Sequence, residues 1–268
     1  MNLAAYLDRI GFEGEARPDR ATLDALQRHH MLAIPYENLD VQLGRPLTPS
    51  PAAAFDKLVT RGRGGWCYEM NGVLGWALSE IGFDVTRVEG AVMRGVVEGS
   101  EANHLVLWVA LAEGPVLADV GLGCGPLRPY GVAESGFGDE GFGFRLAAEA
   151  DGWWRLHNHP GLRPPSFDFR LMPADEAALS AKCQMLQTDP ESIFVQNLIV
   201  QRHVPGGFIS LVGRSLGSFT PAGLTTTTLG SADELLETLA VRFGLVEPAA
   251  ADLWDRVCAR HEALFGAA

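Results

Sequence analysis

Residues 63–88 read RGGWCYEMNGVLGWALSEIGFDVTRV, and the hydrophobic period changes once within them. After Cys67 the apolar side chains recur at helical spacing, which predicts a helix that ends at Gly82. From Asp84 onward the apolar runs are short and typical of strands. The chain therefore has helices first, strands next and a mixed final part. This order predicts the α+β class.

Three further helices are predicted before Cys67. The first carries a helical stripe that ends at Gly11, and the second follows the start signal Pro18-Asp19. The third begins with Ser50 as N-cap and Pro51 at the first helical position. Together with the helix after Cys67, these segments can bury one common core as a small bundle.

Short apolar runs separated by turn residues predict antiparallel β structure in the rest of the chain. The runs are Val85 to Val97, Leu105 to Ala112, Val116 to Val120, Phe142 to Ala147, Trp153 to His157, Ser192 to Arg202, Phe208 to Leu211 and Thr225 to Leu229. The glycine-rich, acidic stretch from Ala133 to Gly143 is predicted to be a mobile loop. Ser231 to Glu234 forms a capping box for a helix that ends at Gly244, and Pro248 opens a last helix.

Composition excludes several classes of function. The 268 residues carry 21 basic and 33 acidic side chains, a net charge of −12, which argues against nucleic-acid binding and against docking on an anionic membrane. The longest wholly apolar run, Leu105 to Ala112, is too short to span a bilayer. The first residues show no secretory signal, so we expect a cytoplasmic protein whose thiols stay reduced.

One of the four cysteines has an unusual local sequence. No CxxC pair is present, so the cysteines predict neither a zinc site nor a dithiol. Cys67 follows two glycines and falls at the start of a predicted helix, where free N–H groups favour a thiolate and can stabilise an oxyanion. Taken alone, Cys67 would more often be a packing residue, and we expect Cys258 to be in the core and Cys124 to be a small loop residue.

A histidine and an aspartate complete a candidate catalytic group. His104 begins the run Leu105 to Ala112, and Asp119 closes the next run after the turn Glu113-Gly114. A hairpin would bring both side chains toward the same end of two paired strands, although the sequence does not fix the register. A thiolate nucleophile needs such a proton acceptor and an orienting group. We therefore predict a site made of Cys67, His104 and Asp119.

Other polar residues receive structural interpretations. His157 and His159 lack a third ligand, so we predict edge or loop residues and no metal site. Glu37 is predicted to pair with Arg63 and so hold the first helical segments against the cysteine loop, a contact that suits the arginine fork.

The sequence resembles the arylamine N-acetyltransferase family. Five segments match in order and cover at least the first half of the chain, whereas the later half matches more loosely. They are Tyr6-Leu-Asp-Arg-Ile-Gly11, Ile34-Pro-Tyr-Glu-Asn-Leu-Asp40, Arg63-Gly-Gly-Trp-Cys-Tyr-Glu-Met-Asn71, Asn103-His-Leu-Val-Leu107 and Asp119-Val-Gly-Leu-Gly123.

The resemblance implies three segments around one cleft. They are a helical bundle over residues 1–83 with the nucleophile, a β-barrel-like domain over 84–190 with the histidine and aspartate, and an α/β lid over 191–268. It also implies a triad like that of papain-type proteases and transglutaminases, formed here by Cys67, His104 and Asp119. The acceptor pocket would include Tyr36, Val92 and Leu122, with phenylalanine usual in the family where Tyr36 and Leu122 stand.

The implied reaction is ping-pong acetyl transfer. Cys67 would take the acetyl group from acetyl-CoA and pass it to an aromatic amine or hydrazine, so acetyl-CoA is a co-substrate and no permanently bound cofactor is expected. Two alternatives remain open: an amide synthase of polyketide biosynthesis, and a transglutaminase or cysteine peptidase with the same triad. The oligomeric state is left open, with a homodimer as one candidate.

Overall fold

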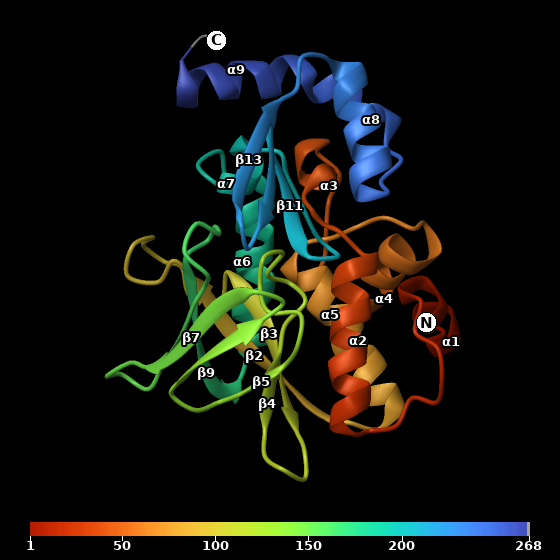
Figure 1. Ribbon diagram of the computed structural model, residues 1–268, viewed down its shortest axis with the longest axis vertical. Coiled ribbons are helices and arrows are strands. Elements are labelled where there is room, and N and C mark those ends of the chain that lie inside the picture. Colours follow the sequence, from red (N-terminus) through yellow and green to blue (C-terminus); the bar gives the residue numbers. More distant parts are fainter. Residues whose placement is uncertain (267–268) are drawn as a thin grey trace.

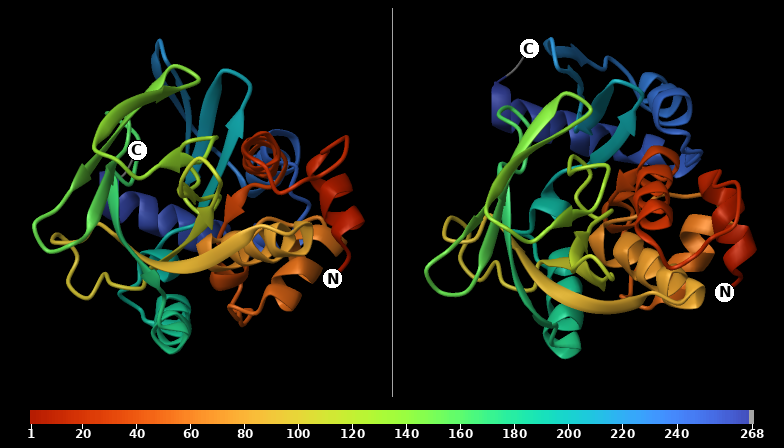
Figure 2. Two further views of the ribbon diagram at one scale, coloured as in Figure 1. Left: turned by 90° about the horizontal axis from the view of Figure 1, so that it is seen from below. Right: turned by 60° about the horizontal axis from the view of Figure 1, so that its bottom comes forward.

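The computed structural model describes residues 1–266 and confirms the α+β class. Figures 1 and 2 show the helices of the N-terminal third grouped on one side of a curled sheet, and in Figure 1 a second sheet and the last helices lie above both. The N-terminal helices are α1 (Leu3–Ile10), α2 (Arg20–Ala33), α3 (Leu39–Gln42), α4 (Pro51–Phe55), the π-helix η1 (Asp56–Thr60) and α5 (Cys67–Ile81). The later helices are α6 (Glu176–Thr188), α7 (Ile193–Gln196), α8 (Ala232–Phe243), the 3-10 helix η2 (Pro248–Leu253) and α9 (Trp254–Phe265).

The curled sheet has eight strands in the order β5-β4-β3-β2-β9-β8-β7-β6. Every neighbouring pair is antiparallel, as the short alternating runs predicted. The strands are β2 (Asp84–Val92), β3 (His104–Ala110), β4 (Val116–Ala118), β5 (Tyr130–Gly131), β6 (Ser135–Asp139), β7 (Phe142–Ala148), β8 (Trp154–His157) and β9 (Ser166–Pro173). Side chains of this sheet form a core rich in phenylalanine.

The second sheet joins the two ends of the sequence. Its strand order is β1-β10-β11-β12-β13, with β1 (Tyr36–Glu37), β10 (Ile199–Val204), β11 (Gly207–Val212), β12 (Ser215–Thr220) and β13 (Gly223–Thr228). Strand β1 pairs Tyr36 with Gln201 and also bridges to Gly65, two residues before Cys67. The C-terminal sheet is therefore attached directly to the cysteine loop.

The core around α5 gathers side chains from distant parts of the sequence. Helix α5 ends at Gly82, which adopts the left-handed conformation expected for a glycine stop. Leu179, Cys183 and Leu186 of α6 pack into the same apolar cluster as α5 and β3. Among the described residues, no helix is both long and apolar enough to cross a membrane.

Two segments have a different secondary structure from the one predicted. The stretch Ala133 to Gly143 is not a loop, because it contains β6, whose Phe137 stacks between Tyr130 and Phe144 at centroid distances of 5.2 and 5.6 Å. These stacked rings stabilise a strand that its glycines obscured. The run Ser192 to Arg202 is not one strand either. Ser192 accepts a hydrogen bond from the backbone N–H of Phe194 at 3.2 Å and caps the short helix α7, after which β10 begins.

Other predicted elements had wrong boundaries. Strand β2 stops at Val92 rather than Val97, because Met93 and Gly95 have positive φ and turn the chain. The helix at Pro51 is one short turn that continues as the π-helix η1, and the Ser50 side chain makes no capping hydrogen bond. Pro248 opens a 3-10 helix before α9 begins. Strands β9 and β12 and helix α6 were not predicted from the sequence.

Candidate active site

Cys67 is the first residue of α5 and is 3% exposed. Trp66 precedes it in extended conformation, and the backbone N–H of Trp66 donates to Glu69 Oε2 at 3.3 Å. Glu69 thereby caps the end of α5 that carries the sulfur. The thiol of Cys67 lies 3.8 Å from the backbone oxygen of Asn103, the residue before His104.

The register of β3 and β4 brings His104 and Asp119 together. Leu107 pairs with Ala118, so the start of β3 lies beside the residue that follows β4. His104 Nε2 and Asp119 Oδ2 are 2.8 Å apart, and both side chains are almost fully buried. The imidazole of His104 also packs edge-on against the ring of Phe167, at a centroid distance of 5.0 Å.

The charge of Asp119 governs the histidine. Burial lowers the pKa of His104, but the charge and hydrogen bond of Asp119 and a hydrogen bond with Cys67 outweigh burial and raise that pKa to about 10. The imidazolium is therefore the favoured form of His104 at neutral pH. Chemically, such an arrangement can supply a nucleophile, a proton carrier and a group that orients the carrier.

Asn71 and Gln27 complete the support of Asp119, and the sequence analysis missed both. Asn71 Nδ2 donates to Asp119 Oδ1 at 2.7 Å, and Asn71 Oδ1 accepts from the backbone of Val120 at 3.0 Å. Gln27 Oε1 accepts from the backbone N–H of Asp119 at 3.1 Å. The spacing of Asn71 four residues after Cys67, on the same helix face, was a usable signal. Nothing local marks Gln27, which comes from α2.

Gly121 lets the loop that carries Asp119 approach Cys67 closely. A Cβ added at Gly121 would lie 2.6 Å from Cys67 Cα and 2.6 Å from Asn71 Nδ2, so no side chain fits between these segments. The backbone N–H of Gly121 also donates to Asp119 Oδ1 at 2.7 Å. The glycine is therefore required by close approach and not by turn conformation.

We expect Gly121→Ala to separate the nucleophile from its partners. Because the clash involves backbone of α5, the displacement should slow Cys67 acylation by about tenfold or more. The matched control is Gly131→Ala, where an added Cβ meets nothing within 4 Å. Single-turnover acylation rates measured beside thermal unfolding would check this. Equal rates for the two variants would contradict the tight contact.

The three predicted pocket residues have different surroundings. Tyr36 is buried on β1, and burial together with the charges of Cys67, Cys124, Asp119 and Glu69 raises the pKa of its phenol. Val92 ends β2, where the side chain of Asn103 bonds both its N–H (2.7 Å) and its carbonyl (3.1 Å). Leu122 is buried in the core of the eight-stranded sheet.

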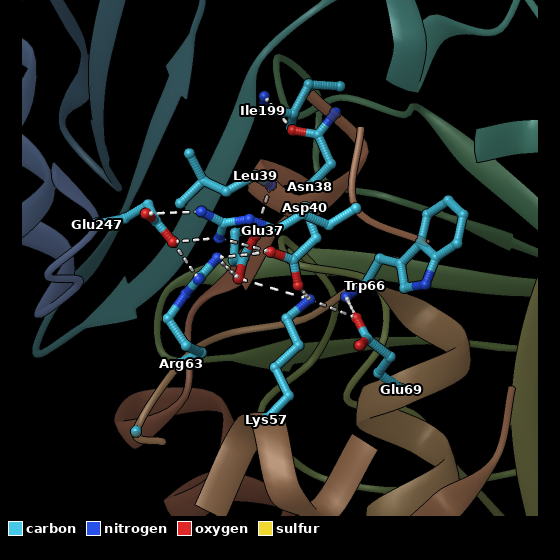
Figure 3. A network of polar contacts seen from close by, with 12 residues as sticks. Glu37, Asn38, Leu39, Asp40, Lys57, Arg63, Trp66, Glu69, Ile199 and Glu247 are labelled. Carbon is cyan, nitrogen blue, oxygen red and sulfur yellow. Dashed lines mark hydrogen bonds and ion pairs between the residues drawn. The ribbon is translucent and has the colours of Figure 1, made fainter. Parts of the chain in front are cut away.

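The predicted pair of Glu37 and Arg63 exists and belongs to a larger network. Arg63 Nη2 lies 3.1 Å from Glu37 Oε1, and Arg63 Nη1 lies 2.5 Å from Glu247 Oε2 of the C-terminal segment. Figure 3 shows these residues converging with Asp40, Lys57 and Glu69 beside the start of α5. The network joins three parts of the sequence to the loop that precedes Cys67.

The other cysteines and histidines that the sequence singled out have different surroundings. Cys124 accepts from Asn158 Nδ2 at 3.3 Å, and burial raises the pKa of its thiol to about 12. Cys258 is half-buried, so it is less enclosed than predicted. His157 contacts Arg145 on neighbouring strands, and His159 accepts from the backbone of Gly143. Within residues 1–266, no group of three or more His, Cys, Asp or Glu side chains could hold a metal ion.

Comparison with known proteins points to one family. A family model described as N-acetyltransferase matches residues 19–250. The chain is 35% identical to an arylamine N-acetyltransferase of Mycolicibacterium smegmatis, over 91% of this chain and 92% of that protein.

Solved structures agree with the sequence comparison. The fold superposes on the arylamine N-acetyltransferase of Mycobacterium marinum in complex with CoA with a TM-score of 0.85, at 31% identity, covering 97% of this chain and 98% of that one. It superposes on the enzyme of Mycobacterium abscessus with a TM-score of 0.86, at 32% identity, covering 96% and 95% of the two chains.

Proposed function

This chain belongs to the arylamine N-acetyltransferase family, and on that premise we propose that it carries an acetyl group from acetyl-CoA to aromatic amines or hydrazines through an acetyl-cysteine at Cys67. The single observation that supports this most is the buried contact of 2.8 Å between His104 Nε2 and Asp119 Oδ2, beside the thiol at the start of α5. Acyl transfer needs that combination of nucleophile, proton carrier and orienting carboxylate.

The first half of the reaction uses the charge distribution around Cys67. The thiolate attacks the thioester carbonyl of acetyl-CoA, and backbone N–H groups at the start of α5 stabilise the oxyanion. The carbon–sulfur bond to CoA then breaks, and the imidazolium of His104 gives its proton to the departing CoA thiolate. One thioester replaces another, so little free energy is lost at this stage.

The second half returns the enzyme to its starting state. The amine nitrogen attacks the acetyl-cysteine, and neutral His104 takes the proton that the nitrogen loses. The amide leaves, and Cys67 is again a thiolate beside an imidazolium. Asp119 holds the imidazole through Nε2, which leaves Nδ1 as the nitrogen that exchanges protons at the reacting atoms.

Initial-rate kinetics test this function. When the concentrations of acetyl-CoA and an arylamine are varied, we expect parallel lines in double-reciprocal plots of the initial rate, because CoA leaves before the amine reacts. Intersecting lines, or release of ammonia from glutamine peptides without a CoA thioester, would replace acetyl transfer by another reaction. The control variant is Cys258→Ala, which should keep the wild-type pattern, because Cys258 is a half-buried residue of α9.

Tyr36 is proposed to shape the acceptor pocket. Its phenol is close enough to Cys67 and Asp119 for their charges to act on it, which supports a place for Tyr36 beside the reacting sulfur. We expect Tyr36→Phe to shift preference toward arylamines with apolar ring substituents by about tenfold in relative kcat/KM. Alkyl- and hydroxyl-substituted anilines would measure the shift. If the ratio of kcat/KM values for the two kinds of aniline did not change, Tyr36 would not be part of the pocket.

The variants Leu122→Phe and Val92→Ala test the other two positions in the same way.

The division of the chain into residues 1–83, 84–190 and 191–268 is likewise proposed, together with a cytoplasmic location. In support of the division, α5 ends just before β2 begins, and β10 to β13 form one sheet with β1. The lid is attached to the bundle by this pairing of β1 with β10 and by the contact of Glu247 with Arg63.

A further inference from the structure

Five ionisable side chains are buried together beside the start of α5. They are Glu37, Asp40, Lys57, Arg63 and Glu69, here called the buried charge cluster, and each is at most 8% exposed. Figure 3 shows how closely their charged ends approach one another. Glu69 lies two residues after Cys67, so the cluster is directly connected to the nucleophile.

The charges of the cluster do not balance. It contains three carboxyl groups, Glu37, Asp40 and Glu69, but only two cations, Lys57 and Arg63. At its rim Glu247 also pairs with Arg45, at 2.6 Å, so these two add no net charge. A fully ionised cluster would bury one uncompensated negative charge, which is costly, and protonation of one carboxyl relieves that cost.

Glu69 is the least compensated of the three carboxyls. Arg63 contacts Glu37 at 3.1 Å and Asp40 at 3.5 Å, and Glu37 also accepts from the backbone N–H of Leu39 at 2.6 Å. The cation recorded beside Glu69 is Lys57, at 2.9 Å. Lys57 is shared with Asp40 at 3.1 Å and with Glu37 at 3.7 Å. Glu69 is therefore the carboxyl on which we place the proton that would balance the cluster.

Electrostatics at Glu69 agree with this count. Burial raises the pKa of Glu69 to about 7, with Lys57 opposing and the charge of Glu37 adding to the rise. The other titratable groups that face it are Tyr36 on β1 and Cys183 on α6, and the pKa of each is itself raised by burial and by the charge of Glu69.

We propose that Glu69 is a positioning residue for Cys67 that works as a neutral carboxylic acid. In this form it caps α5 through the N–H of Trp66 and lies against Gly65, where an added Cβ would be 2.9 Å from Glu69 Oε2. When the O–H bond breaks and the proton passes to solvent, the excess charge lies two residues from the sulfur. That charge disfavours the thiolate and loosens the loop that holds it. The role of Cys67 as nucleophile rests on the proposed function.

Unfolding equilibria measured against pH test the proton. Because the folded protein binds this proton more tightly than the unfolded chain, stability should fall as pH rises from about 4.5 to about 7 and should then level off. Glu69→Gln balances the cluster and removes this dependence. Relative to the variant, the unfolding constant of the wild type should increase on the order of 100-fold between about pH 5 and about pH 8. The matched control is Glu80→Gln, at an exposed carboxyl on the same helix.

Alkylation of Cys67 by iodoacetamide, followed on its peptide by mass spectrometry, tests the positioning. The rate in the wild type relative to Glu69→Gln should fall about tenfold between about pH 6 and about pH 8. A cap with only a structural role would give a ratio that does not change with pH, and that result would overturn the proposal. This probe needs no acetyl-CoA, so failure of acetyl transfer would leave the test of Glu69 intact.

Infrared titration of the wild type covers the case in which Glu69→Gln does not fold. A carboxylic acid C=O band should be present at about pH 6.5, where ordinary carboxyls are ionised, and should disappear by about pH 8.5. Absence of such a band at about pH 6.5 would overturn the proposal without any variant.

Discussion

Replacing Cys67 with alanine should lower acetyl transfer by about 10⁴-fold or more and should prevent any covalent acetyl-enzyme. The reason is that the variant lacks the sulfur, which lies at the start of α5 and hydrogen-bonds the imidazole of His104. Arylamine acetylation measured with acetyl-CoA checks the rate, and the intact mass of the protein checks the adduct.

The matched control for Cys67→Ala is Cys183→Ala. Cys183 is also buried in the core around α5, but burial raises the pKa of its thiol to about 12, so it remains protonated at neutral pH. Its variant should keep the acetyl adduct even where packing lowers stability. If Cys67→Ala retained wild-type turnover while Cys183→Ala lost it, the nucleophile would have been assigned to the wrong cysteine.

Asp119→Asn is expected to lower acetyl transfer by about 10³- to 10⁴-fold while leaving the fold in place. Asparagine can still bond Asn71 and Gly121 through its oxygen, but it removes the charge that raises the pKa of His104 and it presents N–H₂ toward Nε2. The histidine should then favour the tautomer with its proton on Nδ1, which cannot accept a proton from the reacting thiol or amine.

The same variant changes the pH dependence of stability. The pKa of His104 is raised in the folded protein to about 10, so its stabilising contribution is complete below about pH 6.5 and is lost as pH rises through about 10. Asp119→Asn should remove this loss. Unfolding measured between about pH 7 and about pH 10 checks it, and Asp84→Asn, at an exposed carboxyl on β2, is the control. If the unfolding free energy changed with pH equally in the wild type, Asp119→Asn and Asp84→Asn, Asp119 would not control the pKa of His104.

The helical part of the fold could be predicted because its signals are local. The stripe from Met70 to Ile81 with its glycine stop fixed α5, and the pairing of Glu37 with Arg63 followed from residue type. The hairpin of β3 and β4 was also predictable, since two apolar runs flank one short turn. Such signals need no knowledge of what packs against them.

The missed parts depend on contacts between distant residues. Strand β6 contains two glycines in five residues, and only the stacking of Phe137 between Tyr130 and Phe144 makes it a strand. Helix α6 has a weakly amphipathic sequence and is stabilised by burying Leu179, Cys183 and Leu186 against the helical core. Tertiary packing overrides local preference in both cases.

The candidate site shows the same division. Cys67, His104 and Asp119 were predicted from residue type and place, and the structure supplies the 2.8 Å contact between His104 and Asp119. Four other polar residues lie within helices. Gln27 and Asn71 hold Asp119, and Lys57 and Glu69 belong to the buried charge cluster beside Cys67. Only Asn71 carries a sequence signal, its spacing of four residues from Cys67, whereas the roles of the other three become visible only through the contacts that the fold brings together.

Mass spectrometry of the resting enzyme tests the central claim most directly. Incubated with acetyl-CoA alone, the wild type should gain the mass of one acetyl group, located by peptide mapping on Cys67, and should lose it when an arylamine is added. A protein that gains no acetyl group, that carries it on another residue, or that retains it in the presence of the amine would contradict the account.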